Sequence, residues 1–450
     1  MNQESFVEHF ARTFERLTFV QRARTSGWLR RQGKIDAFEF LVGLVFAQMS
    51  ALRLTLNAQA NCCTVPVTRQ AVDQRYNART VAYFRAAFEH CLHQSLAQAP
   101  PPALHAALAA HFAAVHLVDS SAFDCPASLA ALYPGCGGDA SAANVKLLLR
   151  YEYLRSQFVP VALVPGKRSD QGLAGELPAL VQAGELIIAD KAFVKCQALR
   201  DIEHTGGCFL FPWPRSVSLW LPQPQGTSEA LDLAAALRAS TASQLEWPSV
   251  QLGQQPDAPV VRLIVFRLSE ESANRARAGL RESQRKQGRT PTAAALELAG
   301  WLILITNAAV QKLPSLAVAY LYRVRWQIEL VFKQCKSILR LDVTEVRRNV
   351  ERLQCEIWAR LIAAIVFFGW HGHLQAASWA RRRAELSFGQ VSAQLQARGL
   401  SLASALIAGG SSLRSLLWQV WNHLLWTTRK GRQRTRKTTW QSLQHHWLAV

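Results

Sequence analysis

LYRVRWQIELVFKQCKSILR, residues 321–340, combines a polar and an apolar pattern, each with the period of an α-helix. The polar positions lie at offsets 0, 3, 7, 11 and 14 and share one stripe of the helix surface: Tyr322, Arg325, Glu329, Lys333 and Lys336. The apolar positions occupy the opposite face: Leu321, Val324, Ile328, Val331, Phe332, Cys335, Ile338 and Leu339. The segment therefore predicts one helix with a buried side and a polar side.

The polar stripe presents a phenol, a guanidinium, a carboxylate and two ammonium groups over about 20 Å. Such a row suits a polyanion with a metal ion nearby better than a small neutral ligand. The alternative is a solvated surface on which Arg325 and Glu329 form an ordinary i,i+4 pair, worth about 0.3–0.5 kcal/mol. Composition alone favours the solvated surface, because charged stripes are common on exposed helices.

The whole chain is basic and large enough for several domains. Its 450 residues are 50% hydrophobic, which predicts a globular protein of two to four domains. A formal charge of +20 favours a polyanionic partner, with nucleic acid first and anionic membrane as the competitor. We expect no spanning helix, because no run approaches eighteen apolar residues, and we interpret 361–370 as part of a core helix. Nine scattered cysteines and an amino terminus without a secretory pattern favour the reducing cytosol.

Residues 1–112 are predicted to form a helical, DNA-binding domain, with helices at 35–54 and at 80–96, the second capped by Thr80. Between them, 67–76 is typical of a recognition helix, with Thr68 as its cap and Arg69 and Arg75 as its cations. The segment is equally compatible with an ordinary connecting helix. The run QAPPP at 98–102 marks the first boundary.

Strands follow this boundary, and two of them are expected to end in a carboxylate. A strand at 116–118 is predicted to end at Asp119, and a buried strand at 186–189 to end at Asp190. Strands at 145–154 and 158–164 and a crossover helix at 172–183 lie between them in the chain. This order predicts a mixed α/β fold with both carboxylates at strand ends, although each aspartate alone is also a common cap.

Asp119, Asp190 and Glu329 together have a chemical rationale. Three carboxylates held close to one another repel, unless divalent cations neutralise them. Oxygen ligands select hard ions, so Mg²⁺ or Mn²⁺ is expected. Two such ions about 4 Å apart support an in-line displacement at a phosphodiester.

The spacing Y-x2-R-x3-E-x6-K, from Tyr322 to Lys336, resembles the signature of the DDE transposases of the insertion-sequence-four family. The resemblance implies a ribonuclease-H-like catalytic domain at 113–375, interrupted by a mainly β insertion at about 206–300. It also implies that Asp119, Asp190 and Glu329 bind two Mg²⁺ or Mn²⁺ ions. Tyr322, Arg325 and Lys336 would then contact DNA near the cut, and we add Lys333 from the same stripe.

The sequence departs from the family pattern after both aspartates. Ser120 follows Asp119, and Lys191 and Ala192 follow Asp190, where the family more often has glycine or Arg-Gly. Because glycine permits backbone angles that alanine resists, these departures bear on local turn geometry and not on the carboxylates themselves.

Two tryptophans near the polar stripe are candidates for DNA contact. The expected insertion contains strands at 208–213, 216–222 and 260–268 and a charged helix at 269–288, and Trp301 begins the strand that follows. Trp301 is either a core aromatic or, as the resemblance implies, an indole that stacks on a flipped base. Trp326 either packs beside the stripe or touches DNA.

The carboxyl-terminal part is predicted to be helical and basic. A helix at 350–368 closes the catalytic domain, and 376–450 is expected to contact DNA or support assembly. The run RKGRQRTRK at 429–437 suits phosphate contact, with a solvated segment as the alternative.

The function that these features favour is cut-and-paste DNA transposition by a cytoplasmic, nucleoid-associated bacterial protein. Its partners would be double-stranded DNA, as terminal inverted repeats and target, and a second copy of the chain in a dimer or larger assembly, with no membrane. The alternatives are a metal-dependent nuclease that does not join strands and a non-catalytic DNA-binding protein derived from a transposase.

Overall fold

The computed structural model describes residues 3–31, 33–50, 55–61, 63–102, 105–137, 141–223, 227–340 and 349–430. These residues form two compact units, and each unit combines segments that are distant in sequence. Unit 1 contains the described residues of 1–106, 120–168 and 328–430, and unit 2 contains those of 107–119 and 169–327.

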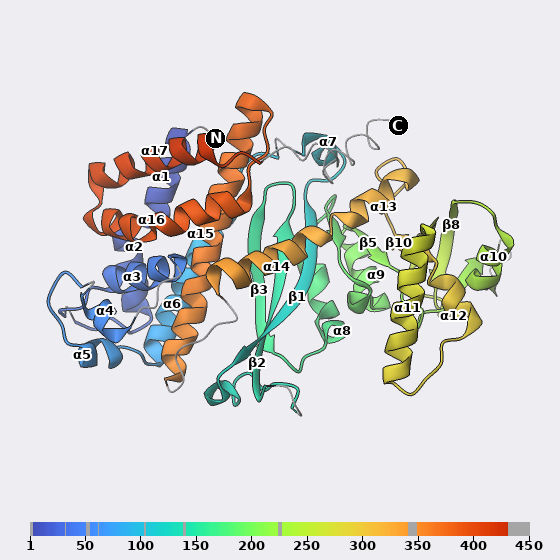
Figure 1. Cartoon of the computed structure of the whole chain (residues 1–450), viewed down its shortest axis with the longest axis horizontal. Coiled ribbons are helices and arrows are strands. Elements are labelled where there is room, and N and C mark those ends of the chain that lie inside the picture. Colours follow the sequence, from blue (N-terminus) through green and yellow to red (C-terminus); the bar gives the residue numbers. More distant parts are fainter. Residues whose placement is uncertain are drawn as a thin grey trace. The chain divides into compact units, whose positions relative to one another are not determined.

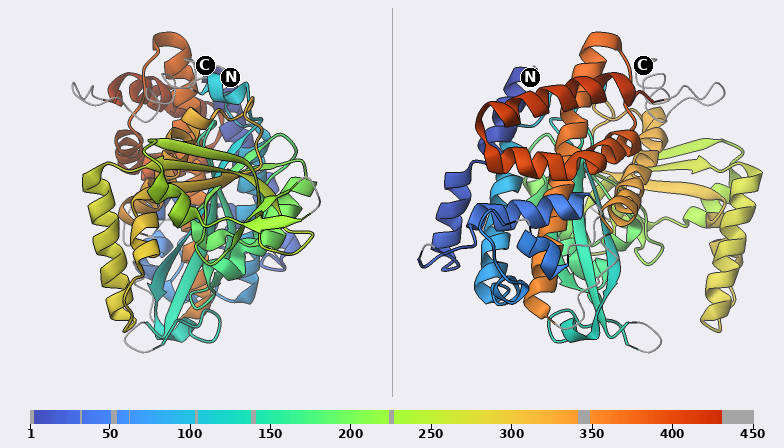
Figure 2. Two further views of the ribbon diagram at one scale, coloured as in Figure 1. Left: turned by 90° about the vertical axis from the view of Figure 1, so that its right-hand side faces the viewer. Right: turned by 60° about the vertical axis from the view of Figure 1, so that its left-hand side comes forward.

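Most helices of unit 1 come from the two ends of the chain (Figure 1). In chain order they are α1 (Gln3–Thr13), α2 (Arg16–Thr25), α3 (Ala37–Met49), α4 (Leu56–Asn61), α5 (Arg69–Asp73), α6 (Ala78–Ala97), α15 (Val350–Arg382), α16 (Phe388–Ala408) and α17 (Gly410–Thr427). α15 packs against α3, α6 and α16 and against one strand of the same unit, and α16 and α17 lie side by side (Figure 2). Gly399 permits close packing of α16 on α3, because a Cβ there would lie 2.1 Å from Ser50 Oγ.

α15 corrects the expectation that no helix is long and apolar enough to span a membrane. It has 33 residues and passes that test by length and composition, but 83% of its most apolar window is buried inside the protein. The buried residues include Leu361, Ile362 and Trp370, so the prediction of a core helix at 361–370 is confirmed. A core helix contacted on several sides is apolar all round, which explains why composition alone does not separate it from a spanning helix.

Two predicted helix starts near the amino terminus have different outcomes. Thr68 caps α5 as expected, because its hydroxyl accepts a hydrogen bond from the Ala71 amide. Thr80 was expected to cap α6, and this is wrong: the helix begins after Asn77, and Thr80 completes a capping box from the third helical position. Leucine 54 and the three residues before it, at the end of the predicted 35–54 helix, lie outside the described residues.

The strands form one mixed sheet in the order β3-β2-β1-β4-β5-β10-β9-β8-β6-β7. In chain order they are β1 (Val115–Cys125), β2 (Ala143–Glu152), β3 (Gln157–Pro165), β4 (Leu186–Ile188), β5 (Cys208–Pro212), β6 (Leu219–Pro222), β7 (Ser228–Ala230), β8 (Gln244–Leu252), β9 (Val260–Arg267) and β10 (Trp301–Thr306). β4 is parallel to β1 and to β5, whereas β2 and β3 are antiparallel. The order 3-2-1-4-5 with these directions is ribonuclease-H-like, which confirms the predicted mixed α/β class.

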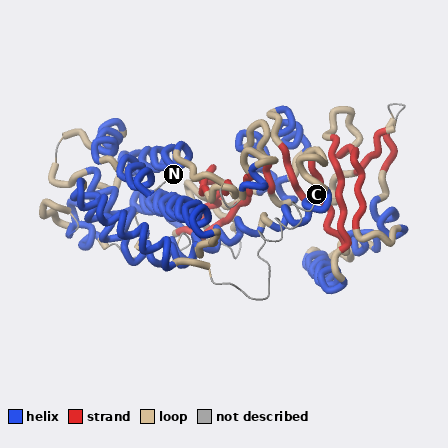
Figure 3. Tube along the Cα trace, turned by 90° about the horizontal axis from the view of Figure 1, so that it is seen from above, coloured by secondary structure: helices blue, strands red, loops and turns tan. Residues whose placement is uncertain are grey.

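The rest of unit 2 extends this sheet by antiparallel strands. β10 pairs with β5 and β9, and β9 pairs with β8, which the tube in Figure 3 shows as neighbouring red strands. The predicted strand at 208–213 is therefore β5, a parallel partner of β4. The remaining helices of the two units are α7 (Ala106–Ala109), α8 (Asp170–Leu173), α9 (Cys196–His204), α10 (Leu233–Ala239), α11 (Glu270–Lys286), α12 (Ala293–Leu298), α13 (Ser315–Arg323) and α14 (Trp326–Leu339), with 3-10 helices at Ala127–Leu129, Ala174–Leu180 and Lys191–Phe193.

The predicted crossover helix at 172–183 is mostly a 3-10 helix. α8 has four residues and continues into the 3-10 helix Ala174–Leu180, which contains Pro178. Proline has no amide hydrogen and clashes with the carbonyl four residues earlier, so a regular α-helix is not maintained there.

Candidate active site

Asp119 and Asp190 each lie two residues beyond the last paired residue of one of two neighbouring parallel strands. The last paired residues of β1 and β4 are Leu117 and Ile188, and each aspartate lies two residues further along its own strand direction. Residues two apart share one face of a strand, and neighbouring strands are about 4.8 Å apart. The register therefore brings the two carboxylates to the same edge of the parallel pairing in unit 2.

The expectation that the first strand ends at Asp119 is wrong. β1 continues to Cys125, so Asp119 lies inside the strand, although its parallel pairing with β4 stops at Leu117. Asp190 does follow the end of β4, and its carboxylate accepts a hydrogen bond from the Lys191 amide at 2.5 Å.

Arg325 and Tyr322 lie beside this pair of carboxylates. The Arg325 Nη1 is 3.9 Å from the Asp119 Oδ2, and the guanidinium carbon is 5.8 Å from the centre of the Tyr322 ring. Both partners of the ion pair are half-buried, so solvent screens the attraction less than it would on an open surface. Two aspartates, a guanidinium and a phenol thus converge within unit 2.

Tyr322 keeps its phenolic proton over an extended pH range. Burial raises the pKa of Tyr322 to about 12, the Arg325 cation opposes this rise, and the negative charges of Asp190 and Asp119 add to it. The phenol is therefore a hydrogen-bond donor at neutral pH, which suits contact with a phosphate oxygen.

This raised pKa predicts a difference between the wild type and Tyr322→Phe in alkali. Above pH 10 the unfolded chain loses the phenolic proton, whereas the folded protein keeps it up to about pH 12, so the wild type loses stability in this interval. Phenylalanine cannot ionise. We expect the free energy of unfolding, measured with urea, to fall more steeply between pH 10 and about 12 in the wild type than in the variant. Parallel curves would contradict the buried environment of Tyr322.

The polar stripe lies on two helices, which corrects the prediction of one continuous helix. α13 ends at Arg323 and α14 begins at Trp326. Between them the Val324 amide donates to the Leu321 carbonyl and the Arg325 amide to the Tyr322 carbonyl, both with i,i+3 spacing. A 3-10 turn has about 3.0 residues per turn instead of 3.6, so it changes the direction of the residues that follow. Neither glycine nor proline marks this turn.

The unit 1 part of the stripe lies on α14. Glu329 is in the first turn and half-buried, Lys333 is exposed, and the Lys336 ammonium donates to the Ala122 carbonyl of β1 at 3.3 Å. A carboxylate in the first turn is favoured by the helix dipole. The predicted apolar face is confirmed, because all of its residues except the half-buried Ile338 are buried.

The two candidate tryptophans differ in exposure. Trp301 is 6% exposed, its indole N–H donates to Glu297 Oε1 at 3.3 Å, and the Arg267 guanidinium lies 4.2 Å from its ring centre. In the structure Trp301 is therefore a covered aromatic at the start of β10. Trp326 is 57% exposed at the start of α14.

The candidate cations near the amino terminus lie in unit 1. Arg69 is exposed as the first residue of the five-residue α5, whereas Arg75 is half-buried, with its guanidinium 5.0 Å from the centre of the Trp28 ring. The neighbouring cations Arg30, Arg31 and Lys34 were not among the predicted site residues. The signal for them was present as a short basic run, RRQGK, immediately before the predicted helix at 35–54.

The chemistry of the carboxylates suits a hard divalent cation. Asp119 and Asp190 carry carboxylate oxygens two residues beyond the last paired residues of β1 and β4, and Glu329 is a third carboxylate, which belongs to the other unit. Within the described ranges no three His, Cys, Asp or Glu side chains form a ready-made metal cluster. The aspartate pair therefore fits part of a metal ligand set.

The fold and the paired aspartates define an enzyme with a ribonuclease-H-like core and an acidic site. The family described as transposase DDE domain matches residues 111–366, which is more than half of the chain, and the protein belongs to this family. It is a DNA transposase, and members of this family generally use divalent metal ions.

Named relatives cover most of the chain at moderate identity. The transposase for insertion sequence element IS231E of Bacillus thuringiensis subsp. finitimus is 24% identical over 98% of this chain and 92% of its own length. The transposase for insertion sequence element IS1151 of Clostridium perfringens is 26% identical over 76% of each chain. Among solved structures, a piggyBac transposase synaptic complex with hairpin DNA is a distant likeness, with 11% identity and a TM-score of 0.44 over 97% of this chain and 87% of that chain.

Proposed function

We propose that this transposase hydrolyses phosphodiester bonds at the ends of its own element and joins the freed 3′-hydroxyl groups to target DNA. The observation that carries the proposal is the β1–β4 register, which sets Asp119 beside Asp190, with Arg325 and Tyr322 next to them. A paired-carboxylate site with adjacent cations is suited to charged phosphodiesters.

In the proposal, Asp119, Asp190 and Glu329 hold two divalent ions, Mg²⁺ or Mn²⁺, in each active site. Such ions, when bound, stabilise the negative charge on the attacking and leaving oxygens of the displacement. Carboxylate oxygens are the ligands that these hard ions prefer. Arg325 contacts DNA near the cut, and its ion pair with Asp119 also keeps that carboxylate in place.

The remaining side chains of the stripe would hold the DNA. Tyr322 donates its phenolic proton to a phosphate oxygen, and Lys333 and Lys336 attract the backbone as point charges. The exposed Trp326 stacks on a base or sugar. For Trp301 to stack on a flipped base, the Arg267 guanidinium has to leave its ring.

Each of the three domains has a role in the proposed function. We assign 1–112, with Arg69 and Arg75, to DNA binding, 113–375 to catalysis with a β-rich insertion at about 206–300, and 376–450 to DNA contact or assembly. At the start of the insertion range, β5 belongs to the core sheet, because it is a parallel partner of β4. In the basic run 429–437, all residues after 430 lie outside the described residues. The DNA partners are the terminal inverted repeats and target DNA. The protein acts as a dimer or larger assembly, in the nucleoid of a bacterial cytoplasm. The burial of α15 supports a partner other than the membrane.

The experiment that tests the proposal combines labelled element-end DNA, supercoiled target and purified protein, with Mn²⁺ or with EDTA. Joined product that depends on the metal ion is the expected result. Cleavage without joining would contradict the proposal and indicate a nuclease. Binding without cleavage would contradict it and indicate a non-catalytic DNA-binding protein. Labelled DNA of unrelated sequence is the control for recognition of the ends.

A further inference from the structure

A basic pocket lies in unit 1, and none of its lining residues is among the side chains assigned to the active site. It has a volume of about 830 Å³ and is lined by the segment between α2 and α3 and by the segment around α5. Five of its lining residues are cations: Arg30, Arg31, Lys34, Arg75 and Arg79. The lining contains no aspartate or glutamate, so the pocket is a concentrated positive site.

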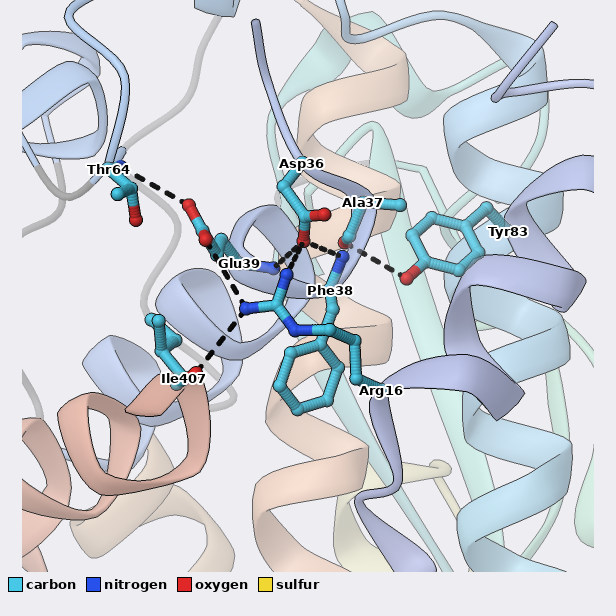
Figure 4. Close-up of polar contacts among 8 residues, drawn as sticks. All are labelled: Arg16, Asp36, Ala37, Phe38, Glu39, Thr64, Tyr83 and Ile407. Atoms are coloured by element: carbon cyan, nitrogen blue, oxygen red, sulfur yellow. Dashed lines mark hydrogen bonds and ion pairs between the residues drawn. The ribbon is translucent and has the colours of Figure 1, made fainter. Parts of the chain in front are cut away.

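The positive charge of the pocket is not neutralised within the described part of the chain. No ion pair joins any of the five cations to a carboxylate among the residues that the structure describes. The acids nearest in sequence, Asp36 and Glu39, are both paired with Arg16, at 3.0 and 3.3 Å. Figure 4 shows this arrangement, in which Asp36 also caps α3 and Glu39 accepts from the Thr64 amide. A cluster of unpaired cations repels itself and is stabilised by a bound polyanion.

Trp28 is the buried aromatic side chain of the pocket lining. Its ring is buried, the Arg75 guanidinium lies over it at 5.0 Å, and the indole N–H has no acceptor among the described residues. A Cβ at position 33 would lie 3.0 Å from Nη2 of Arg75, so glycine leaves room for the guanidinium. Arg75 is thereby fixed with restricted freedom, which lowers the entropy cost of binding an anion.

We propose that this pocket grips the phosphodiester backbone of duplex DNA without reading its sequence. The pocket is lined by Thr68, Ala71 and Gln74 from the α5 segment, together with the five cations, whereas Arg69 is not part of the lining. Cations of this kind position a duplex through its phosphates, whereas sequence is read by side chains that reach base edges. This inference rests on the proposed function in one respect, because that function identifies the bound polyanion as DNA.

The test measures the affinity of the full chain for a fluorescent element-end duplex, in EDTA, over a series of salt concentrations. The pocket variant carries Arg31→Ala, Lys34→Ala and Arg79→Ala. The matched control carries Arg12→Ala, Arg24→Ala and Arg414→Ala, three exposed cations outside the lining, so both variants lose the same charge. We expect the slope of log affinity against log salt to fall by about 2 to 3 in the pocket variant and by less than about 1 in the control, for specific and random duplexes alike.

Several outcomes would overturn the proposal. Equal losses in the two variants would assign binding to overall charge, and no loss in either would leave the pocket without a DNA ligand. Inorganic phosphate or a nucleoside triphosphate that displaces the duplex at matched ionic strength would point to a free phosphate ligand instead. Loss of binding to anionic lipid vesicles, with DNA binding intact, would point to a membrane.

A second measurement uses the unmodified protein and does not depend on the folding of a variant. Lys34 is exposed in the structure, and we expect duplex DNA to protect it from an amine-reactive label, as detected by mass spectrometry. Lysine 286, exposed on α11 and outside the lining, is the internal reference. Equal labelling of Lys34 with and without DNA would contradict the proposal. Because no cleavage occurs in EDTA, a failure of the transposition assay leaves these results unchanged.

Discussion

Glu329→Gln is expected to abolish cleavage and joining of element-end DNA, with a loss of at least about 10³-fold in rate. A charged carboxylate that holds a divalent ion contributes several kcal/mol to the reaction, and each 1.36 kcal/mol corresponds to about tenfold. The amide keeps the size of the side chain but loses its charge. Glu329 lies in the first turn of α14, whose buried face includes Ile328 and Phe332, so the helix itself should persist. Single-turnover assays with Mn²⁺ measure the rate.

Glu329→Gln is expected to change the rate of the chemical step and not the affinity for DNA. Affinity for end DNA, measured in EDTA, should change by less than about threefold, because one carboxylate is a small part of a surface with a formal charge of +20. Glu282→Gln on α11 is the isosteric control, and it should cleave like the wild type because Glu282 pairs with neighbouring cations of its own helix, Arg285 and Lys286. A Glu329→Gln protein that cleaves at the wild-type rate would remove Glu329 from the proposed metal ligands.

Arg262→Met is expected to destabilise unit 2 by about 2–4 kcal/mol. Arg262 is 8% exposed, and its guanidinium donates to Glu246 Oε1 at 2.9 Å and to the carbonyls of Ala308 and Leu313 at 2.8 and 3.0 Å. Methionine fills much of the space but leaves these acceptors without their donor. The partial exposure of Glu246 keeps the expected loss below that of a fully buried ion pair.

Arg262 also holds the start of the helix that carries Tyr322. Its Nη2 donates to Ser315 Oγ at 3.1 Å, Ser315 in turn donates to Glu246, and α13 begins at Ser315. We therefore expect Arg262→Met to reduce cleavage as well, with little change in affinity for DNA in EDTA.

Urea unfolding measures the loss of stability in Arg262→Met. Arg275→Met is the matched control, because Arg275 and its partner Glu271 are 74% and 83% exposed, and it should change stability by less than about 0.5 kcal/mol. Equal stability of the two variants would show that the Arg262 contacts contribute no more than a surface pair.

The local patterns of the sequence determined much of the fold. Alternating and continuous apolar runs located β2, β3, β4 and β9, the charged run at 269–288 located α11, and the 3.6-residue period located the buried face of α14. The two aspartates were recognised because each follows a short buried run. These features depend on residues that are close to one another in the sequence, so they can be recognised from the sequence alone.

The tertiary structure alone determined where these helices and strands begin and end and how they pair and pack with one another. The 3-10 turn at Val324 and Arg325 has no glycine or proline to announce it, and β1 passes through Asp119 without a break. The pairing of Leu117 with Ile188, the anchoring of α13 by Arg262 and the pocket shared by Arg31 and Arg79 join residues that are far apart in sequence. Such contacts arise from packing and strand register, which periodicity does not encode, because it describes one element at a time.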